Sequence, residues 1–124
     1  MKVIIAGSRG FNDFDKLCEV CNKALLNHDI VEIVSGGAKG ADKLGEQYGR
    51  LRDFKIKQFI PNWNELGKRA GFVRNCEMGD YADALIAFWD GYSSGTKQMI
   101  DYAKSKGLNN PNEVLVIIKP LLKY

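Results

Sequence analysis

The stretch 33-IVSGGAKGADKLGEQYG-49 decides the fold, because an apolar run passes through a glycine-rich turn into a helical pattern. The apolar run spans residues 30–35 and is typical of a strand covered on both faces. Residues 39–53 then predict a helix. The turn itself has two interpretations that the residues leave open: a tight strand-to-helix turn, or a loop whose backbone N–H groups bind a phosphate. Its spacing matches neither G-x-G-x-x-G nor the Walker loop.

The same alternation of strand and helix continues along the chain. Apolar runs predict further strands at 2–7, 55–60, 83–89 and 113–118. Helices are expected after Asp13 or Asp15 and over 93–107, while glycines interrupt the helical spacing of 64–81. The pattern predicts a Rossmann-like three-layer α/β/α sandwich of about five mainly parallel strands, in the order 3-2-1-4-5. A chain of 124 residues is expected to form a single domain, 1–124.

Composition excludes several classes of protein. The net charge of +3 is far from that of a dedicated DNA-binding module, and no segment reaches membrane-spanning length. The first apolar run is too short for a signal peptide, so a cytoplasmic protein is expected. The cysteines, Cys18, Cys21 and Cys76, form no disulfide framework, and His28 is the only histidine, so neither metal nor cofactor is expected.

Three glycine-rich polar loops follow the first, second and fourth predicted strands: GSRGF, SGGAKGAD and WDGYSSGT. Ligands of such folds bind beyond the carboxyl ends of the strands, where the strand order reverses. Backbone N–H groups at two helix starts, the hydroxyls of the third loop and the Arg9 guanidinium suit a phosphate, and Trp63 or Trp89 could stack on a base. The residues expected to bind the ligand are Gly7, Ser8, Arg9, Ser35, Gly36, Gly37, Ala38, Lys39, Gly40, Asp42, Lys68, Arg74, Asn75, Trp89, Asp90, Gly91, Ser94, Gly95 and Thr96.

Four segments together resemble a known family. GSRGFND, SGGAKGADKLGEQYG, PNW…GKRAGFVRNCEM and DALIAFWDGYSSGTKQMI, spread over roughly residues 3–106, look like the small YspA-like branch of the SLOG superfamily, the Smf/LOG-type Rossmannoid proteins. The resemblance implies a nucleotide-related ligand, a homo-oligomer (a dimer or tetramer), and a possible place in a phage or mobile element, and hence in the host cytoplasm. LOG-type relatives are phosphoribohydrolases, Smf relatives bind single-stranded DNA, and other members sense ADP-ribose-like signals.

The catalytic motif of the LOG-type hydrolases, P-G-G-x-G-T-x-x-E, carries over only in part. Gly36, Gly37 and Gly40 match its glycines, whereas Ala41 replaces the threonine and Leu44 the glutamate. Glu46 lies two positions further along the helix, about 200° around its axis. The candidate catalytic acids are therefore Asp42, Glu46 and Asp90.

Three functions follow from these residues. The first is a sensor or sequestering protein that binds a phosphorylated nucleotide or a nucleotide-derived signal. Such binding needs loops whose backbone N–H groups can bind an anion, together with cations, and the chain supplies both. An N-glycosidase acting on nucleoside monophosphates needs a carboxylate near the sugar. Single-stranded nucleic-acid binding needs a continuous basic groove, which a near-neutral chain does not favour. We therefore expect binding, with no membrane and no nucleic acid as partner.

Overall fold

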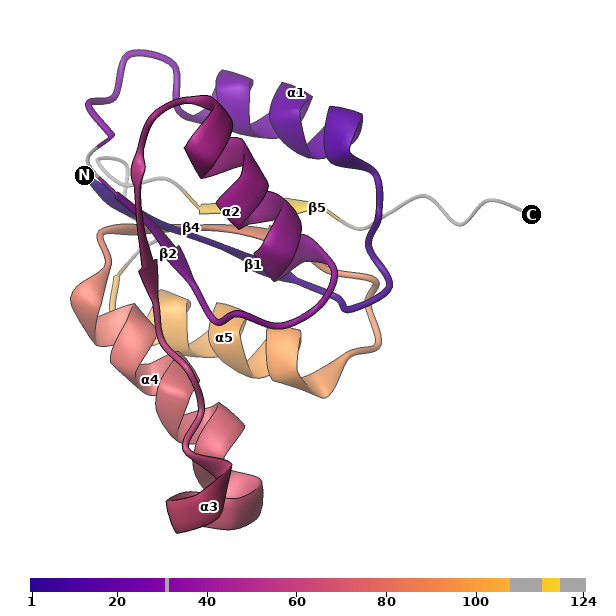
Figure 1. Ribbon diagram of the computed structural model, residues 1–124, viewed down its shortest axis with the longest axis vertical. Coiled ribbons are helices and arrows are strands. Elements are labelled where there is room, and N and C mark those ends of the chain that lie inside the picture. The colour runs from indigo at the N-terminus through magenta and orange to yellow at the C-terminus, as the bar shows by residue number, and fades with distance from the viewer. Residues whose placement is uncertain (31, 108–114, 119–124) are drawn as a thin grey trace.

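The computed structural model describes residues 1–30, 32–107 and 115–118, and within them five strands form one parallel sheet (Figure 1). The strands are β1 (Lys2–Gly7), β2 (Glu32–Ser35), β3 (Lys55–Gln58), β4 (Ala84–Phe88) and β5 (Leu115–Ile118), in the order β3-β2-β1-β4-β5. The predicted Rossmann-like α/β fold and its strand order are confirmed. Ile30, the first residue of the second predicted strand, is not in a strand, and residue 31 lies outside the described residues. Strand β3 ends earlier than expected. Residues 113 and 114 of the predicted last strand lie outside the described residues.

The helices alternate with these strands. They are α1 (Phe14–Ala24), α2 (Ala41–Leu51), α3 (Trp63–Leu66), the 3₁₀ turn η1 (Gly67–Arg69), α4 (Ala70–Tyr81) and α5 (Ser94–Ser105). Of the two predicted caps of α1, Asp13 is the cap: its carboxylate accepts a hydrogen bond from the Lys16 backbone N–H at 3.0 Å. The glycine-interrupted stretch 64–81 divides into α3, η1 and α4. Within the described parts of the chain, no helix is long and apolar enough to cross a membrane.

Two apolar clusters hold the layers together, one on each face of the sheet. Alternate residues of β1 point to opposite faces, so that Val3 and Ile5 belong to one cluster and Ile4 and Ala6 to the other. Helices α1 and α2 cover the first face, and α4 and α5 cover the second (Figure 1). Cys18 and Cys21 have C-x-x-C spacing, and Cys21 is fully buried in the first cluster as an ordinary core residue.

The reversal of strand order positions the candidate site. The chain runs outward from β1 to β2 and β3, and then returns to β4 on the other side of β1. The loops after β1, β2 and β4 therefore leave the same edge of the sheet around this switch point. The fold brings together three loops that are far apart in the sequence.

Candidate functional site

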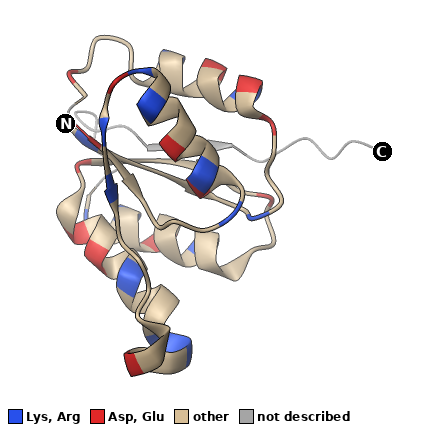
Figure 2. Ribbon diagram, in the orientation of Figure 1, with Lys and Arg blue, Asp and Glu red and all other residues tan. Residues whose placement is uncertain are grey.

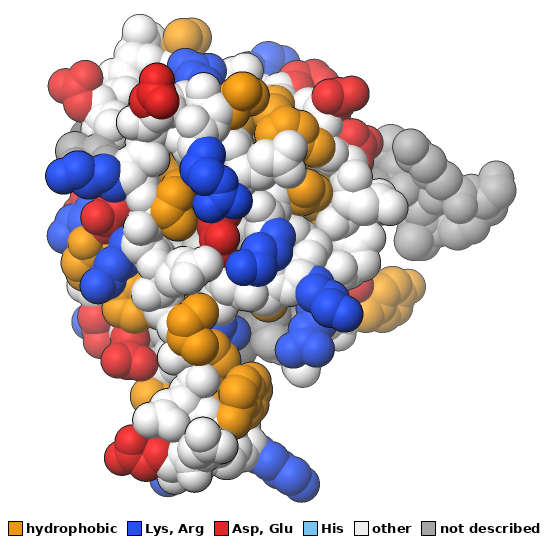
Figure 3. Space-filling model, in the orientation of Figure 1, with side chains coloured by type: hydrophobic (Ala, Val, Ile, Leu, Met, Phe, Trp, Pro, Cys, Tyr) orange, Lys and Arg blue, Asp and Glu red, His pale blue; other side chains and the backbone are white. Residues whose placement is uncertain are grey.

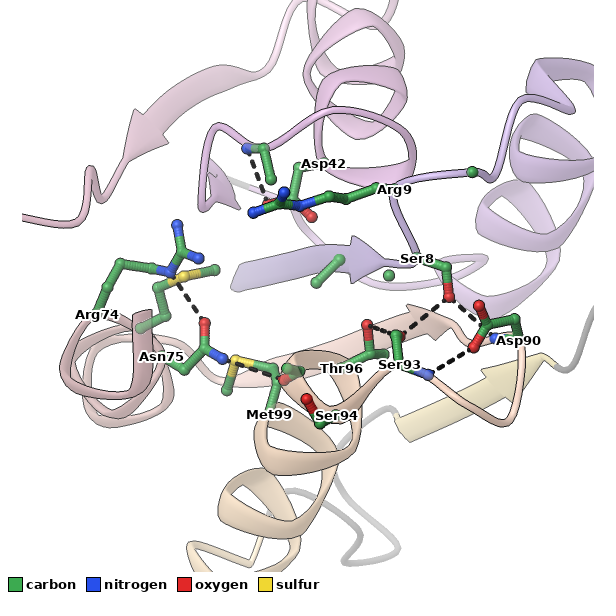
Figure 4. Close-up of a pocket in the computed structure, with 16 residues that line it drawn as sticks. Ser8, Arg9, Asp42, Arg74, Asn75, Asp90, Ser93, Ser94, Thr96 and Met99 are labelled. Carbon is green, nitrogen blue, oxygen red and sulfur yellow. Dashed lines mark hydrogen bonds between the residues drawn. The ribbon is translucent and has the colours of Figure 1, made fainter. Parts of the chain in front are cut away.

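A cavity of about 490 Å³ lies at this edge of the sheet, between the start of α2 and the helices α4 and α5 (Figure 4). It is lined by Ala6, Gly7, Ser8, Arg9, Gly10, Ala38, Asp42, Arg74, Asn75, Met78, Asp90, Ser93, Ser94, Gly95, Thr96 and Met99. The lining comes from all three predicted loops and from α4. We call it the switch-point cleft.

A chain of hydroxyl groups joins the first loop to the third. The Ser8 hydroxyl accepts a hydrogen bond from the Asp90 backbone N–H at 3.0 Å and lies 3.3 Å from the Ser93 hydroxyl. Ser93 in turn donates to the hydroxyl of Thr96 at 3.0 Å. The Ser8 proton can go to Ser93 or to the Asp90 carboxylate. Because each hydroxyl has one proton and Ser93 donates its own to Thr96, the Thr96 proton remains for another acceptor. The chain therefore ends in a donor on the wall of the cleft.

Helix α5 adds backbone donors beside that hydroxyl. Its N-cap is Ser93, whose side chain makes no capping bond to the helix. No described residue accepts a hydrogen bond from the backbone N–H groups of Ser94, Gly95 and Thr96. Unpaired N–H groups and the positive end of the helix dipole favour an anion at this position.

Asp90 forms the turn that precedes α5. Its Oδ1 accepts hydrogen bonds from the backbone N–H groups of Tyr92 and Ser93, both at 2.8 Å. These two bonds stabilise the carboxylate and hold the pKa of Asp90 below its ordinary value. A carboxylate committed in this way shapes the loop and is poorly suited to proton transfer.

Two arginines line the switch-point cleft in different ways. The Arg74 guanidinium donates from Nη1 to the carbonyl oxygen of Gly36 and, at 3.4 Å, to that of Phe59, while its Nε donates to Asn75 Oδ1 at 2.9 Å. The Nη2 group donates no hydrogen bond to another described residue. Arg9 is exposed and makes no ion pair within the described chain. Arg74 is thus held in place by the protein, and Arg9 is free to move.

Asp42 is the buried carboxylate of the switch-point cleft, with 5% of its surface exposed. Its Oδ2 accepts a hydrogen bond from the Ala38 backbone N–H at 3.2 Å, and no ion pair of the described residues includes it. Burial raises the pKa of Asp42 to about 6, against the opposing effects of the Ala38 amide and of Arg74. The glycine-rich loop after β2 therefore donates to the Asp42 carboxylate. The unpaired backbone N–H groups that suit an anion lie at the start of α5 instead.

Asp42→Asn is expected to stabilise the fold at neutral pH. The native pKa lies above the ordinary 3.8, so the stability that this group contributes below pH 4 is lost as the pH rises to about 6. Arg9 and Arg74 lie near the carboxylate and Glu46 lies on the same helix, and all three charges are present in both the variant and the wild-type protein. We expect the variant to gain about 1 to 2 kcal/mol at pH 7 and almost nothing at pH 4. Urea unfolding at pH 4, 5, 6 and 7 measures this, and a gain independent of pH would contradict it.

Comparison with known proteins identifies the family of the chain. The sequence profile of the YspA, cpYpsA-related SLOG family matches residues 1–65, just over half of the chain. The Gene 61 protein of Mycobacterium phage D29 is 31% identical over 117 residues, which cover 86% of this chain and 91% of the phage protein. The chain belongs to the YspA, cpYpsA-related SLOG family. No solved structure matches it significantly. Membership is consistent with a nucleotide-related ligand or activity, and the family match covers the first two loops of the cleft.

Of the residues expected to bind the ligand, the fold brings eleven to the switch-point cleft. They are Gly7, Ser8, Arg9, Ala38, Asp42, Arg74, Asn75, Asp90, Ser94, Gly95 and Thr96. Eight others do not line it: Ser35, Gly36, Gly37, Lys39, Gly40, Lys68, Trp89 and Gly91. Most of these eight shape the walls from behind or face solvent.

The buried Ser35 and Glu46 explain part of this difference. The Ser35 hydroxyl donates to Glu46 Oε2 at 2.6 Å and accepts from the Gly37 backbone N–H at 3.0 Å. Burial alone would raise the pKa of Glu46, but the bonds from Ser35 and Gln58 and the nearby Lys43 and Arg50 hold it below its usual value. This candidate acid therefore binds the loop after β2 to β3, outside the cleft.

The remaining cations and aromatic side chains lie elsewhere. Lys39 and Lys68 are exposed, and Lys68 sits in η1, beside the projecting α3. Trp89 donates from its indole N–H to the Ser93 carbonyl at 3.0 Å and packs against the second core cluster. Trp63 is 53% exposed on α3, where Figure 3 shows hydrophobic side chains at the surface. Neither tryptophan lines the cleft.

Sequence reasoning missed five lining residues: Ala6, Gly10, Met78, Ser93 and Met99. Ser93 stands in the third loop, where the sequence left open whether its hydroxyl contacts a ligand or only caps the helix. Met78 and Met99 fit the helical spacing of core residues, and both are almost fully buried. Only the packing of α4 against α5 places them at the floor of a cavity.

Proposed function

We propose that the switch-point cleft binds a phosphorylated nucleotide or a nucleotide-derived signal, such as an ADP-ribose-like molecule, which the protein senses or sequesters. The observation that carries the proposal is the group of donors at the start of α5. The unpaired N–H groups of Ser94, Gly95 and Thr96, together with the Thr96 hydroxyl, face the same cavity as Arg9 and Arg74. A phosphate offers the acceptors and the charge that these groups lack.

The size and apolar floor of the cleft also support a nucleotide. A volume of about 490 Å³ falls within the range of small-molecule sites, roughly 300–1,000 Å³. Met78 and Met99 supply an adaptable apolar surface beside the polar groups. A base could pack against these side chains, a role that the two tryptophans are not placed to fill.

A thermal-shift screen of nucleotides tests the proposal. A ligand present at 100 times its dissociation constant adds about 2.7 kcal/mol to the stability of the folded protein. We expect at least one phosphorylated nucleotide to raise the melting temperature, and Arg9→Ala to reduce the rise. Lys39→Ala is the matched control, because Lys39 is an exposed cation next to the cleft that does not line it. A rise that Arg9→Ala and Arg74→Ala leave unchanged would place the ligand elsewhere.

A second candidate, the nucleotide N-glycosidase, is favoured by one observation. Of the three candidate acids, only Asp42 both lines the cleft and has its pKa raised, to about 6. A carboxyl with that pKa can accept a proton from water near neutral pH. Incubation with nucleoside monophosphates, followed by chromatography, tests this activity. Release of free base that falls by about 100-fold or more in Asp42→Asn would establish it, and unchanged nucleotide would exclude it.

Single-stranded nucleic-acid binding has less support. Figure 2 shows basic and acidic residues interspersed along the ribbon. The overall charge of +3 agrees with this mixture. A groove that follows a nucleic-acid backbone needs a continuous run of cations.

A further inference from the structure

Asp42 differs from every other polar group that lines the switch-point cleft. It is 95% buried, its Oδ2 accepts a hydrogen bond from the Ala38 backbone N–H at 3.2 Å, and the Gly7 backbone N–H also interacts with the carboxylate, which belongs to no ion pair of the described residues. An ionised carboxylate has room for about four hydrogen bonds. The Asp42 carboxylate is therefore an acceptor with unfilled capacity on the wall of a cavity.

The opposite wall supplies donors. The start of α5 presents three unpaired N–H groups and the Thr96 hydroxyl. Arg74 is not part of this wall, because its guanidinium lies next to Gly36, as the Asp42 carboxylate does. The other carboxylate in the cleft, that of Asp90, is occupied by Tyr92 and Ser93. Figure 4 shows Asp42 and Arg9 on one side of the cleft, with Ser93, Ser94 and Thr96 across from them. The backbone donors of α5 thus lie across the cleft from the Asp42 carboxylate.

We propose that Asp42 selects ligands whose phosphate is carried on a ribose with a free 2-hydroxyl, and discriminates against the 2-deoxy sugar. The proposal rests on the proposed function, because it requires a phosphate at α5. With the phosphate there, the sugar lies between the two walls, and its hydroxyls are the donors that can reach the carboxylate. A 2-deoxy sugar leaves this buried acceptor without its partner, at the cost that an unpaired charged group carries.

Titration of the isotopically labelled protein with ribose 5-phosphate, 2-deoxyribose 5-phosphate and inorganic phosphate tests this proposal. The NMR chemical shifts of the Gly95 and Thr96 backbone amides report binding of the phosphate. The chemical shifts of the Ala38 and Asp42 amides report binding of the sugar. We expect ribose 5-phosphate to bind at least about tenfold more tightly than the deoxy sugar. In Asp42→Asn the two affinities should approach each other, while inorganic phosphate still shifts the α5 signals.

Glu46→Gln is the matched control, since Glu46 is the other buried acid of α2 and lies outside the cleft. Once its folding has been checked by thermal unfolding, it should keep the preference for ribose. Equal affinities of the two sugars for the wild-type protein, with clear shifts at α5, would overturn the role of Asp42 and leave the phosphate site intact. No shift of any cleft signal with all three probes would overturn the proposed function as well.

Discussion

Arg74→Ala is expected to lower the affinity for the best nucleotide of the thermal-shift screen by about 100-fold. The Arg74 guanidinium is held by bonds to Gly36, Phe59 and Asn75, so its free Nη2 group meets a phosphate without first losing side-chain freedom. The substitution also leaves a buried carbonyl and the Asn75 amide oxygen without their donor, which should cost about 1 to 3 kcal/mol of stability. Isothermal titration calorimetry and urea unfolding measure the two effects.

Arg9→Ala separates binding from stability in the same experiment. Arg9 is exposed and has no ion pair among the described residues. Its loss should therefore lower the affinity for the ligand and leave the free energy of unfolding nearly unchanged. If Arg74→Ala bound the nucleotide as tightly as the wild-type protein, the guanidinium would be a purely structural tie between α4 and the loop after β2.

Gly40→Ala is expected to reduce the free energy of unfolding by about 3 to 4 kcal/mol. Gly40 is the N-cap of α2, with φ +79° and ψ −129°, a conformation that side chains rarely adopt. A methyl group there would collide with the backbone carbonyl oxygens of Ser8 and Arg9. Because both obstacles are backbone, the first two loops of the cleft would have to separate. Chemical denaturation measures the loss.

Gly10→Ala provides the matched control for this prediction. Gly10 is also a loop glycine that lines the cleft, but nothing lies within 4 Å of the position that its methyl group would take. Its φ is not in the positive range, and we expect a change within about 1 kcal/mol. Similar losses in Gly10→Ala and Gly40→Ala would show that the close approach at Gly40 is not what holds the two loops together.

The fold could be predicted because its strands have a local signature. Residues 2–7 and 83–89 are continuous apolar runs, and the structure buries every residue of β4 between two helical layers. The stretch 64–81 could not be divided correctly, because Gly67 and Gly71 interrupt the helical spacing, and only the structure shows Gly67 at φ +59°, where α3 gives way to η1.

The polar composition of the cleft was predictable, but the roles of its acids were not. Asp42, Glu46 and Asp90 are equivalent as letters in a sequence. In the structure, Glu46 is bound by Ser35 and Gln58, and Asp90 by the backbone amides of its own turn. Asp42 is bound by backbone amides of the loops after β1 and β2. These differences depend on contacts that cross the sheet and its loops.

The sequence by itself determined the alternation of strand and helix, the three glycine-rich loops and the family, because each depends on residues close together in the chain. In the stretch SGGAKGAD, the prediction from local sequence differs from what the tertiary structure shows. Its glycines predict a turn with exposed N–H groups, and that prediction is local. Only the tertiary structure decided that the Asp42 carboxylate accepts a hydrogen bond from the loop and that the unpaired backbone N–H groups belong to the start of α5. This outcome depends on which segments the parallel sheet brings side by side.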